Sequence, residues 1–322
     1  MGSRVPPTAH IPLLVIAGPT ACGKTAQGVR LCEALNGEVV SADSMQVYTG
    51  LPIATAKPTV EEMRGVPHHL IGVIPPTERF SLARYTALAH AAIRDIRARG
   101  RLPVLVGGTG LYIRAVCENL VLPEEETDRA LRAYLSERFA REGGEALLRG
   151  LALADPVAAA RIHPNDQKRV VRALELLHGG GMTLTAQNEA SRLVPSPYDC
   201  RVLLLGMDDR PLLYERVNRR VDAMFARGLE EEARAFLAQN PGDTAAQAIG
   251  CKELAPCFRG ERSLAEAAER LKMETRRYAK RQMSWFRVQC PQGEIVPGRD
   301  GGWAVEEDEI EGLREWYNGM AR

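Results

Sequence analysis

The stretch "IAGPTACGKT", residues 16–25, contains the complete pattern G-x-x-x-x-G-K-[ST]. An apolar run at residues 13–17 leads into it and predicts a buried strand, and residues 25–35 have helical spacing. In such a loop, glycines let backbone N–H groups close on phosphate oxygens, and the helix N-terminus adds positive charge. Lys24 supplies a full charge and Thr25 can bind Mg²⁺. The stretch therefore predicts a phosphate-binding loop.

The surrounding chain predicts an α/β fold with a P-loop NTPase-like parallel sheet core. Two further strands are expected at "GEVVSAD", residues 37–43, and "LPVLVGG", residues 102–108. Between them lies a helical pattern with Ser81 as its cap and Gly100 as its stop. Strands that alternate with helices form parallel sheets, and ligand loops then lie at the carboxyl ends of the strands.

The middle of the chain predicts an inserted all-helical domain. Residues 123–192 contain helical patterns and no convincing strand, and one helix there is expected to be capped by Asn165. Strand-like sequence then returns at "RVLLLGM", after a linker. We expect a first part of the core at 1–120, a helical insertion at 121–195, and the remaining core with a C-terminal basic helix at 196–322.

Acidic residues at strand ends bear on the chemistry. A P-loop ATPase usually holds Mg²⁺ with an acid at the end of a neighbouring strand. Here one strand ends in Gly107, Gly108 and Thr109, which form a second ligand loop or a plain tight turn. Asp43 follows another strand and could act as a general base or cap the next turn. The metal-holding acid is unassigned, which weakens the hydrolase interpretation.

A basic helix is expected at "AERLKMETRRYAKRQMSWFR", residues 268–287, which contains seven basic and two acidic residues. One stripe of this helix contains Arg276, Lys280, Met283 and Arg287, and the next contains Arg277, Arg281 and Ser284. Basic stripes with interleaved aromatics suit a nucleic-acid backbone, although a solvated face with core aromatics is the alternative. A second basic patch at Lys168, Arg169 and Arg172 favours RNA.

Bulk composition limits the remaining possibilities. The 322 residues carry a net charge of +1, so a nucleic-acid site must come from local clustering. Seven cysteines without a CxxC pattern support neither a disulfide framework nor a zinc site. The N-terminus lacks a signal-peptide pattern, and no apolar run approaches the roughly 20 residues that span a bilayer. We expect a cytoplasmic protein without a membrane segment.

The quoted motifs also resemble those of a known family. The chain resembles the bacterial tRNA dimethylallyltransferases, also called tRNA isopentenyltransferases. The matching motifs run in order from about residue 14 to 287. They are "GPTACGKT", "SADSMQVY", "TAKPT", "PHHL", "ERFSLARY", "LVGGTGLYI", "HPNDQKRVVRALE", "LYERVNRRVDAMFARGLEEE", "QAIGCKE" and "RRYAKRQMSWFR".

The resemblance implies a reaction and its partners. The phosphate loop would bind dimethylallyl diphosphate rather than ATP, with Mg²⁺ as cofactor. The five-carbon group would move to the exocyclic N6 amine of the adenine at tRNA position 37, beside the anticodon, with release of diphosphate. The partner would be the anticodon stem-loop of tRNA. Separately, the single insert gives no hint of a dimer interface, so we expect a monomer.

The resemblance also implies roles for particular residues. The implied catalytic residues are Asp43 as general base, Thr109 and Arg220. The implied diphosphate-binding residues are Gly18, Pro19, Thr20, Ala21, Cys22, Gly23, Lys24 and Thr25, with Thr25 also the metal ligand. The implied tRNA-binding residues are Asp43, Ser44, Met45, Gln46, Lys168, Arg169, Val170, Val171, Arg172, Gln247, Ala248, Ile249, Gly250, Cys251 and Lys252. The charge pattern of the basic helix adds Arg276, Arg277, Lys280 and Arg281.

Three positions depart from the family pattern, and two other activities stay open. Cys251 replaces the usual Tyr, Gly72 the usual Asp, and Ala54 the usual Gly, which puts one tRNA contact and the turn near His69 in doubt. A P-loop small-molecule kinase would explain the first 110 residues but leave the basic helix without a role. An adenylate isopentenyltransferase would share the core and act on free nucleotide.

Overall fold

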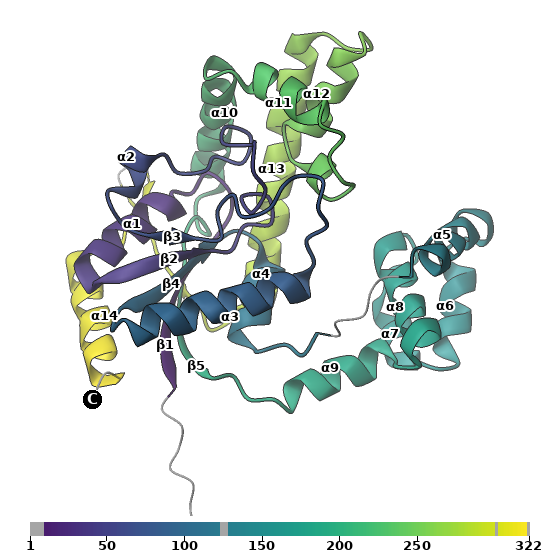
Figure 1. Cartoon of the computed structure of the whole chain (residues 1–322), viewed down its shortest axis with the longest axis horizontal. Helices are drawn as coiled ribbons and strands as arrows, with labels where there is room; N and C mark the ends of the chain where they lie inside the picture. Colours follow the sequence, from purple (N-terminus) through teal and green to yellow (C-terminus); the bar gives the residue numbers. More distant parts are fainter. Residues whose placement is uncertain (1–9, 123–127, 300–301, 321–322) are drawn as a thin grey trace, which may run out of the picture. The chain divides into compact units, whose positions relative to one another are not determined.

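The structure, a computed structural model, describes residues 10–122, 128–299 and 302–320. The chain forms two compact units, one from residues 1–117 with 197–322 and the other from Glu118–Ser196. Each unit has its own cluster of buried apolar side chains. The smaller unit contains the teal helices that lie between the two parts of the larger unit in the chain (Figure 1).

The larger unit is built on a six-stranded parallel sheet in the order β3-β2-β4-β1-β5-β6. Its strands are β1 Ile11–Ala17, β2 Gly37–Ser41, β3 His68–His69, β4 Leu102–Gly107, β5 Tyr198–Leu204 and β6 Glu294–Ile295. The expected α/β fold is confirmed. β5 begins at Tyr198, where the sequence predicted a linker, because residues 198–204 pair in parallel with β1. The two-residue strands β3 and β6 are not apparent in the sequence.

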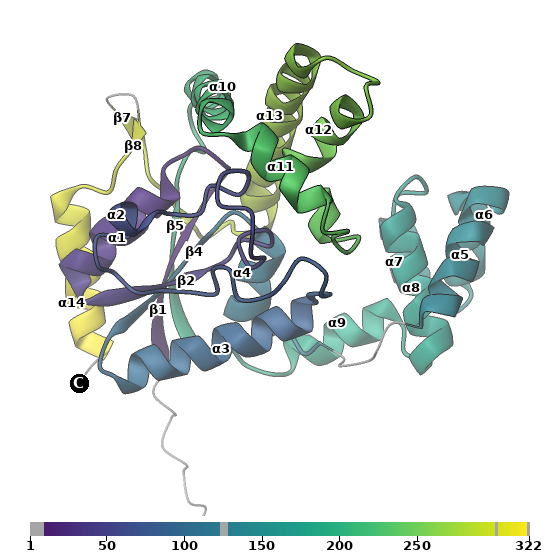
Figure 2. The same cartoon turned by 45° about the horizontal axis from the view of Figure 1, so that its top comes forward.

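Helices cover both faces of this sheet (Figure 2). The helices of the larger unit are α1 Lys24–Leu35, α2 Val60–Met63, α3 Leu82–Ala98, α4 Gly110–Cys117, α10 Arg210–Ala226, α11 Leu229–Leu237, α12 Cys251–Phe258, α13 Leu264–Gln289 and α14 Glu307–Met320. A 3-10 helix spans Ala245–Gln247, and β7 Gly298–Arg299 pairs with β8 Gly302–Trp303. Because crossovers between parallel strands are right-handed, α1 and α3 lie on opposite faces.

Helix α13 illustrates how the sequence specifies an element. Ser263 caps its first turn, and Glu266 returns a hydrogen bond in a capping box. Its buried residues recur every three or four positions and pack into the core of the larger unit. The helix therefore shows one face to the core and the opposite face to solvent.

The smaller unit is helical, with α5 Arg129–Glu142, α6 Gly144–Ala152, α7 Pro156–Arg161, α8 Gln167–Gly180 and α9 Leu184–Arg192. The cap expected at Asn165 is wrong: Asp166 directly precedes α8, and its carboxylate accepts the Arg169 N–H at 3.2 Å. Asn165 instead donates its backbone N–H to His163 in the turn before the helix.

Candidate functional site

The phosphate loop connects β1 to α1. Gly18 has φ +148°, and a Cβ there would lie 2.2 Å from the carbonyl oxygen of Leu205. Gly23 caps α1 with φ +94°. These values require glycine at both positions. Lys24 Nζ donates to the Pro19 carbonyl at 2.6 Å, so the lysine lies against its own loop. The loop thus has the positive charge and the tight turn that the motif predicts.

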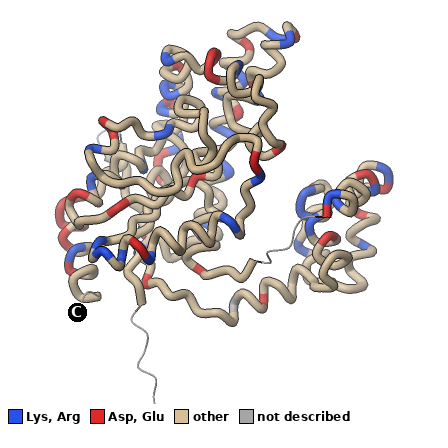
Figure 3. Tube along the Cα trace, viewed as in Figure 1, with Lys and Arg blue, Asp and Glu red and all other residues tan. Residues whose placement is uncertain are grey.

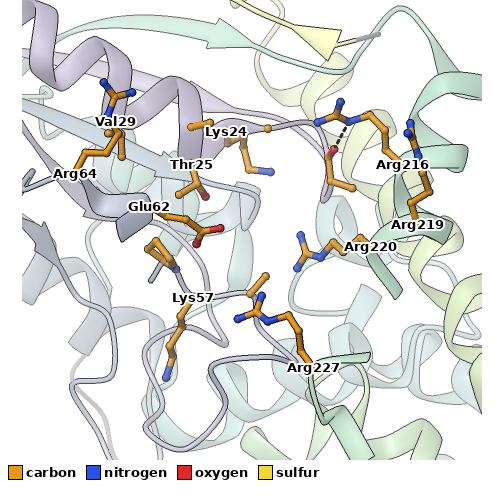
Figure 4. A pocket seen from close by; sticks show the side chains of 15 residues that line it. Lys24, Thr25, Val29, Lys57, Glu62, Arg64, Arg216, Arg219, Arg220 and Arg227 are labelled. Carbon is orange, nitrogen blue, oxygen red and sulfur yellow. Dashed lines mark hydrogen bonds between the residues drawn. The ribbon is translucent and has the colours of Figure 1, made fainter. Parts of the chain in front are cut away.

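A cavity of about 720 Å³ opens beside this loop (Figure 4). Its described lining contains one carboxylate, Glu62, and an excess of cations. The lining cations are Lys24, Lys57, Arg64, Arg216, Arg219, Arg220 and Arg227. Some of them are engaged elsewhere, because Arg64 pairs with Glu33 and Arg219 pairs with Glu215. The lining still carries a large positive excess, which suits a polyanion such as a diphosphate.

Helix α10 supplies the cations opposite the loop. Arg216 Nε donates to the Ala21 carbonyl at 3.0 Å, and a Cβ at Gly23 would lie 3.7 Å from its guanidinium. Burial lowers the pKa of the Arg220 guanidinium, and the negative charge of Asp43 opposes that shift. An arginine stays charged throughout the physiological range. Arg220 therefore brings a positive charge to both the cavity and Asp43.

Asp43 lies two residues beyond β2, at the carboxyl edge of the sheet. Its Oδ1 accepts the backbone N–H groups of Met45 at 2.8 Å and Gln46 at 3.2 Å. Asp43 therefore does form the turn cap that the sequence left open. A carboxylate has two oxygens with several lone pairs, so this cap leaves capacity for a further hydrogen bond. Capping and proton abstraction are thus compatible roles for one side chain.

Thr109 joins the Asp43 segment to the loop after β4. Its backbone N–H donates to the Ala42 carbonyl at 3.1 Å, and its hydroxyl accepts the Ser44 N–H at 3.0 Å. The side chain of Tyr278 on α13 interacts with Thr109, and burial raises the pKa of the Tyr278 hydroxyl. Asp43, Thr109 and Tyr278 are therefore neighbours, although they come from three distant segments.

The solvent face of α13 is basic, but only in part as predicted. Arg277, Lys280 and Arg281 are exposed and line a surface hollow of about 560 Å³ together with Trp285. Figure 3 shows the charges along the chain.

The residues of the stripe through Arg276 do not form a continuous basic surface. Arg276 donates to Asn218 at 2.5 Å, Arg287 donates to the Met207 carbonyl, and Met283 is buried. Packing interrupts the stripe, because the apolar period of the helix turns some of its positions toward the core. Of its basic residues, Lys280 is the one that also lines the hollow.

Only some of the predicted RNA-contacting residues of α8 have exposed side chains. Lys168 and Arg169 are exposed, and Arg172 pairs with the buried Glu175 at 3.5 Å. Val170 and Val171 are buried in the core of the smaller unit. The prediction that the side chains of Val170 and Val171 contact RNA is therefore wrong. A helix that packs against its neighbours turns its apolar positions inward.

The segment from Gln247 to Lys252 exposes only some of its side chains. Gln247 and Lys252 are exposed, whereas Ala248 and Cys251 are buried. Burial raises the pKa of the Cys251 thiol to about 12. The prediction that the side chains of Ala248 and Cys251 contact RNA is therefore wrong, because both pack inside the protein. The Cys251 departure is accommodated inside the protein rather than on its surface.

The other two departures also fit the structure. Gly72 has φ +62°, a left-handed conformation that glycine adopts without strain. The backbone N–H groups of Ile53 and Ala54 both donate at 2.7 Å to the carboxylate of Glu232 on α11. His69 hydrogen bonds to the buried Glu38 at 2.7 Å, which agrees with a structural role.

Three residues near the cavity were not singled out in the sequence. Lys57 lines the cavity and donates to the Tyr48 carbonyl, and burial lowers the pKa of its ammonium group. Arg216 and Gln282 both reach the phosphate loop, from positions far along the chain. Their contacts span about 200 residues or more, so no local pattern could reveal them. The available signals were the motifs that contain these residues, "TAKPT", "LYERVNRRVDAMFARGLEEE" and "RRYAKRQMSWFR".

Known families match the chain over most of its length. The model of the IPP transferase family matches residues 46–289, and that of the isopentenyl transferase family matches residues 11–71. The chain belongs to the IPP transferase family. A tRNA dimethylallyltransferase of Geobacillus kaustophilus is 46% identical to this IPP transferase over 92% of this chain and 94% of its own length. One of Geobacter metallireducens is 49% identical over 85% and 89%.

Solved structures agree with this IPP transferase assignment. The full-length tRNA isopentenylpyrophosphate transferase of Bacillus halodurans superimposes with a TM-score of 0.68 at 42% identity and covers 96% of each chain. A eukaryotic dimethylallyltransferase acting on tRNA has a TM-score of 0.76 at 31% identity and covers 89% of this chain and 73% of its own. Within residues 10–122, 128–299 and 302–320, no helix is both long and apolar enough to cross a membrane.

Proposed function

We propose that this protein transfers a dimethylallyl group from dimethylallyl diphosphate to the exocyclic N6 amine of the adenine at tRNA position 37, with release of diphosphate. One observation carries the proposal: Arg220 lines the phosphate cavity and is electrostatically coupled to Asp43. The charge of Asp43 thus interacts with a cation of the anion site, which supports assigning both to one site. The names of the relatives, which specify dimethylallyl or isopentenyl transfer to tRNA, support the same reaction.

The cations of the cavity stabilise the leaving diphosphate. Negative charge accumulates on the diphosphate as the allylic C–O bond breaks, and the allylic carbon tolerates the positive charge that it gains. Lys24 and Arg220 lie where they can neutralise the departing oxygens, in a cavity that is already positive. Arg216 supports the loop by holding the Ala21 carbonyl.

We propose Mg²⁺ as the cofactor, with Thr25 as its protein ligand. No three His, Cys, Asp or Glu side chains within the described residues gather to form a metal site. Mg²⁺ needs no such cluster, since it binds substrate phosphates and water through one or two protein oxygens. Thr25 fits because it lines the cavity next to Lys24. When bound, the ion would neutralise charge on the diphosphate.

At the other end of the site, Asp43 accepts the proton that the adenine amine loses as its nitrogen bonds to the allylic carbon. Thr109 holds the Asp43 segment by its bonds to Ala42 and Ser44. The adenine must leave its stack to reach this point, as bases do in other base-modifying enzymes. Ser44, Met45 and Gln46 follow Asp43 and are the proposed lining of the adenine pocket.

We propose that tRNA contacts come from the exposed basic residues. On α13 these are Arg277, Lys280 and Arg281, and on α8 they are Lys168 and Arg169. The exposed Lys252 belongs to this set, and the exposed amide of Gln247 is proposed as a further contact. A small-molecule kinase or an enzyme for free nucleotide would leave these groups without a role. We further propose that the protein acts as a monomer in the cytoplasm, where tRNA is found.

One assay tests the proposed function. Purified protein is incubated with labelled dimethylallyl diphosphate and offered unmodified tRNA, free AMP, or ATP with small acceptors. We expect label on tRNA alone, at the adenine beside the anticodon. Efficient transfer to AMP would favour the free-nucleotide enzyme, and ATP turnover stimulated by a small acceptor would favour the kinase.

A further inference from the structure

Helix α13 contains two buried polar side chains, Thr275 and Gln282, which are 6% and 7% exposed. The Thr275 hydroxyl donates to the Leu271 carbonyl of its own helix at 2.7 Å. Gln282 instead reaches out of the helix to two loops of the site. A buried amide that leaves its own helix must satisfy both of its polar ends elsewhere.

The Gln282 amide does so by bridging the phosphate loop and the loop after β4. Its Oε1 accepts the backbone N–H of Thr20 at 2.8 Å, across 262 positions of the chain. Its Nε2 donates to the Gly108 carbonyl, also at 2.8 Å. One side chain therefore holds the two loops at a set spacing.

The amide of Gln282 suits this bridge because it offers a donor and an acceptor at the end of one long side chain. The bridge needs one acceptor and one donor, and an ionised carboxylate only accepts while lysine and arginine only donate. Gly108 leaves room for it, since a Cβ there would lie 2.4 Å from Gln282 Nε2. A glycine and a glutamine 174 positions apart thus match in shape and in hydrogen bonding.

From Gly108 the contacts continue to the candidate base. The next residue, Thr109, bonds to Ala42 and Ser44 on either side of Asp43. Tyr278, one turn before Gln282 on α13, contacts Thr109 as well. The phosphate loop and the Asp43 segment are therefore tied to one helix, and that helix also bears the exposed Lys280 and Arg281.

We propose that Gln282 is a positioning residue that sets the distance between the diphosphate site and Asp43. The inference rests on the proposed transfer reaction, in which carbon, leaving oxygen and amine must align. Misplacement by about 1 Å can cost on the order of a hundredfold in rate. Gln282 touches neither the allyl donor nor the amine in this role; it acts through the backbones of Thr20 and Gly108.

The first test replaces Gln282 with methionine, which is similar in size but neither donates nor accepts a strong hydrogen bond. In Gln282→Met we expect kcat for transfer to tRNA to fall at least about tenfold, and inorganic pyrophosphate to bind at least about threefold more weakly. Binding of tRNA should stay close to wild type. Thr275→Val, a matched loss of a buried polar group on the same helix, should lose stability at most and keep kcat.

The second test uses Gln282→Glu, which keeps the shape of the side chain. The introduced carboxyl group cannot donate to Gly108 when it is ionised, whereas in its neutral form it can donate there and accept from Thr20. Burial favours the neutral form. The ratio of kcat in Gln282→Glu to kcat in the wild type, at equal pH, should therefore rise severalfold from about pH 8.5 to about pH 6. The ratio cancels titrations that both proteins share.

The outcomes separate this inference from the proposed function. A wild-type protein that transfers no label to tRNA contradicts the function, and the pyrophosphate affinity of Gln282→Met then still tests the positioning role. If the wild type is active, a Gln282→Met protein with kcat and pyrophosphate affinity within about twofold of wild type overturns the inference. A kcat ratio for Gln282→Glu that does not change with pH overturns it as well, even if the methionine variant fails to fold.

Discussion

At the scale of single residues, Asp43 both caps a turn and serves as the proposed base, two roles that different side chains usually perform. One carboxylate oxygen caps the turn through Met45 and Gln46, which holds the side chain in a defined direction. The charge of Arg220 lies close enough to affect it electrostatically. A base that is held by a turn and faced by a cation needs no reorganisation at the moment of reaction.

Asp43→Asn tests this base directly. Asparagine keeps an oxygen to accept from Met45 and Gln46, so the turn should persist, but it cannot take a proton. We expect single-turnover transfer to fall at least about a hundredfold, the usual range for lost acid–base catalysis. Pyrophosphate and tRNA affinities should be retained. Asp209→Asn is the control, because Asp209 caps α10 through Leu212; transfer near the wild-type rate in both variants would exclude Asp43 as the base.

Two adjacent arginines of α10 allow a matched test of the diphosphate site. Arg220 is half-buried in the cavity beside Asp43, whereas Arg219 pairs with Glu215 at 3.3 Å and is mostly exposed. Arg220→Gln should weaken pyrophosphate binding by roughly tenfold to a hundredfold, because a hydrogen bond to a charged group contributes about 1.5–3 kcal/mol. Arg219→Gln should change it little. Calorimetric titration measures both, and equal effects would mean that the cavity acts only as a diffuse positive field.

The residues of this site differ in how far the sequence reveals them. The phosphate loop and Asp43 follow strands directly, so local patterns place them at the sheet edge. Gln282 meets Thr20 from 262 positions away, and Arg216 meets Ala21 from 195. Such contacts depend on how α10 and α13 pack against the rest of the larger unit, and the spacing of apolar residues along one helix does not predict that packing.

At the scale of elements, Glu38 joins β2 to β3 and to the end of α3. This carboxylate is 1% exposed and accepts from Arg99, Arg101 and His69. The hydrogen bond from Arg99 lowers the pKa of Glu38 to about 2, against the opposing effect of burial. The cluster stabilises the short strand β3, which has only two residues to pair with β2.

The Glu38 cluster predicts acid sensitivity. The folded pKa lies below the unfolded value near 4.5, so the stabilisation is present above about pH 4.5 and is lost as the pH falls toward 2. Glu38→Gln should lower the free energy of unfolding by about 2 kcal/mol at neutral pH, with allowance for the exposure of Arg99. Urea unfolding should show that difference shrinking with acid. Glu78→Gln, in an exposed pair with Arg84, is the control, and a difference independent of pH would refute the assignment.

The exposed face of α13 predicts a salt effect. If Lys280 and Arg281 contact RNA phosphates, replacing both with Gln should weaken tRNA binding. It should also flatten the slope of log affinity against log salt by roughly 0.7–0.9 for each phosphate that is no longer neutralised. Pyrophosphate binding should hardly change. Arg314→Gln on α14 removes a basic residue paired with Glu311 and serves as control. An unchanged slope with reduced thermal stability would show that these α13 residues stabilise the fold and do not contact RNA phosphates.

Elements with strong local patterns were predictable, and short ones were not. β1, β2 and β4 are apolar runs flanked by glycines or helices, and α3 begins after its expected cap Ser81. β3 and β6 have two residues each and exist only because a neighbouring strand pairs with them. The cap of α8 was assigned one residue early, since Asn165 and Asp166 are both good capping residues.

At the scale of the whole molecule, the phosphate cavity and the smaller unit are built from separate parts of the chain. Every described residue that lines the cavity belongs to the larger unit. The smaller unit has its own apolar core around α5, α6 and α8. Leu135, Leu147 and Val170 illustrate that core and are all nearly fully buried. Separate cores are what domains that fold independently require.

This division predicts that the insertion can be removed without loss of the diphosphate site. Asn119 Nδ2 donates to the Pro195 carbonyl at 3.2 Å, so the chain enters and leaves the smaller unit at one point. Replacing residues 120–194 with a short Gly/Ser linker should therefore close the larger unit without strain, since a short flexible loop can span neighbouring ends. The shortened protein should unfold cooperatively and bind pyrophosphate within about threefold of the intact chain.

The same variant should lose most of its affinity for tRNA, because the exposed Lys168 and Arg169 leave with the insertion. The intact chain with Lys168→Gln and Arg169→Gln is the matched control, and its loss of affinity should be smaller and more dependent on salt. Calorimetry with pyrophosphate and a filter-binding assay with tRNA measure the two effects side by side. A shortened protein that folds but no longer binds pyrophosphate would show that the smaller unit helps to form the donor site. Full tRNA affinity after the deletion would instead place recognition entirely on the larger unit, with α13 as the principal contact.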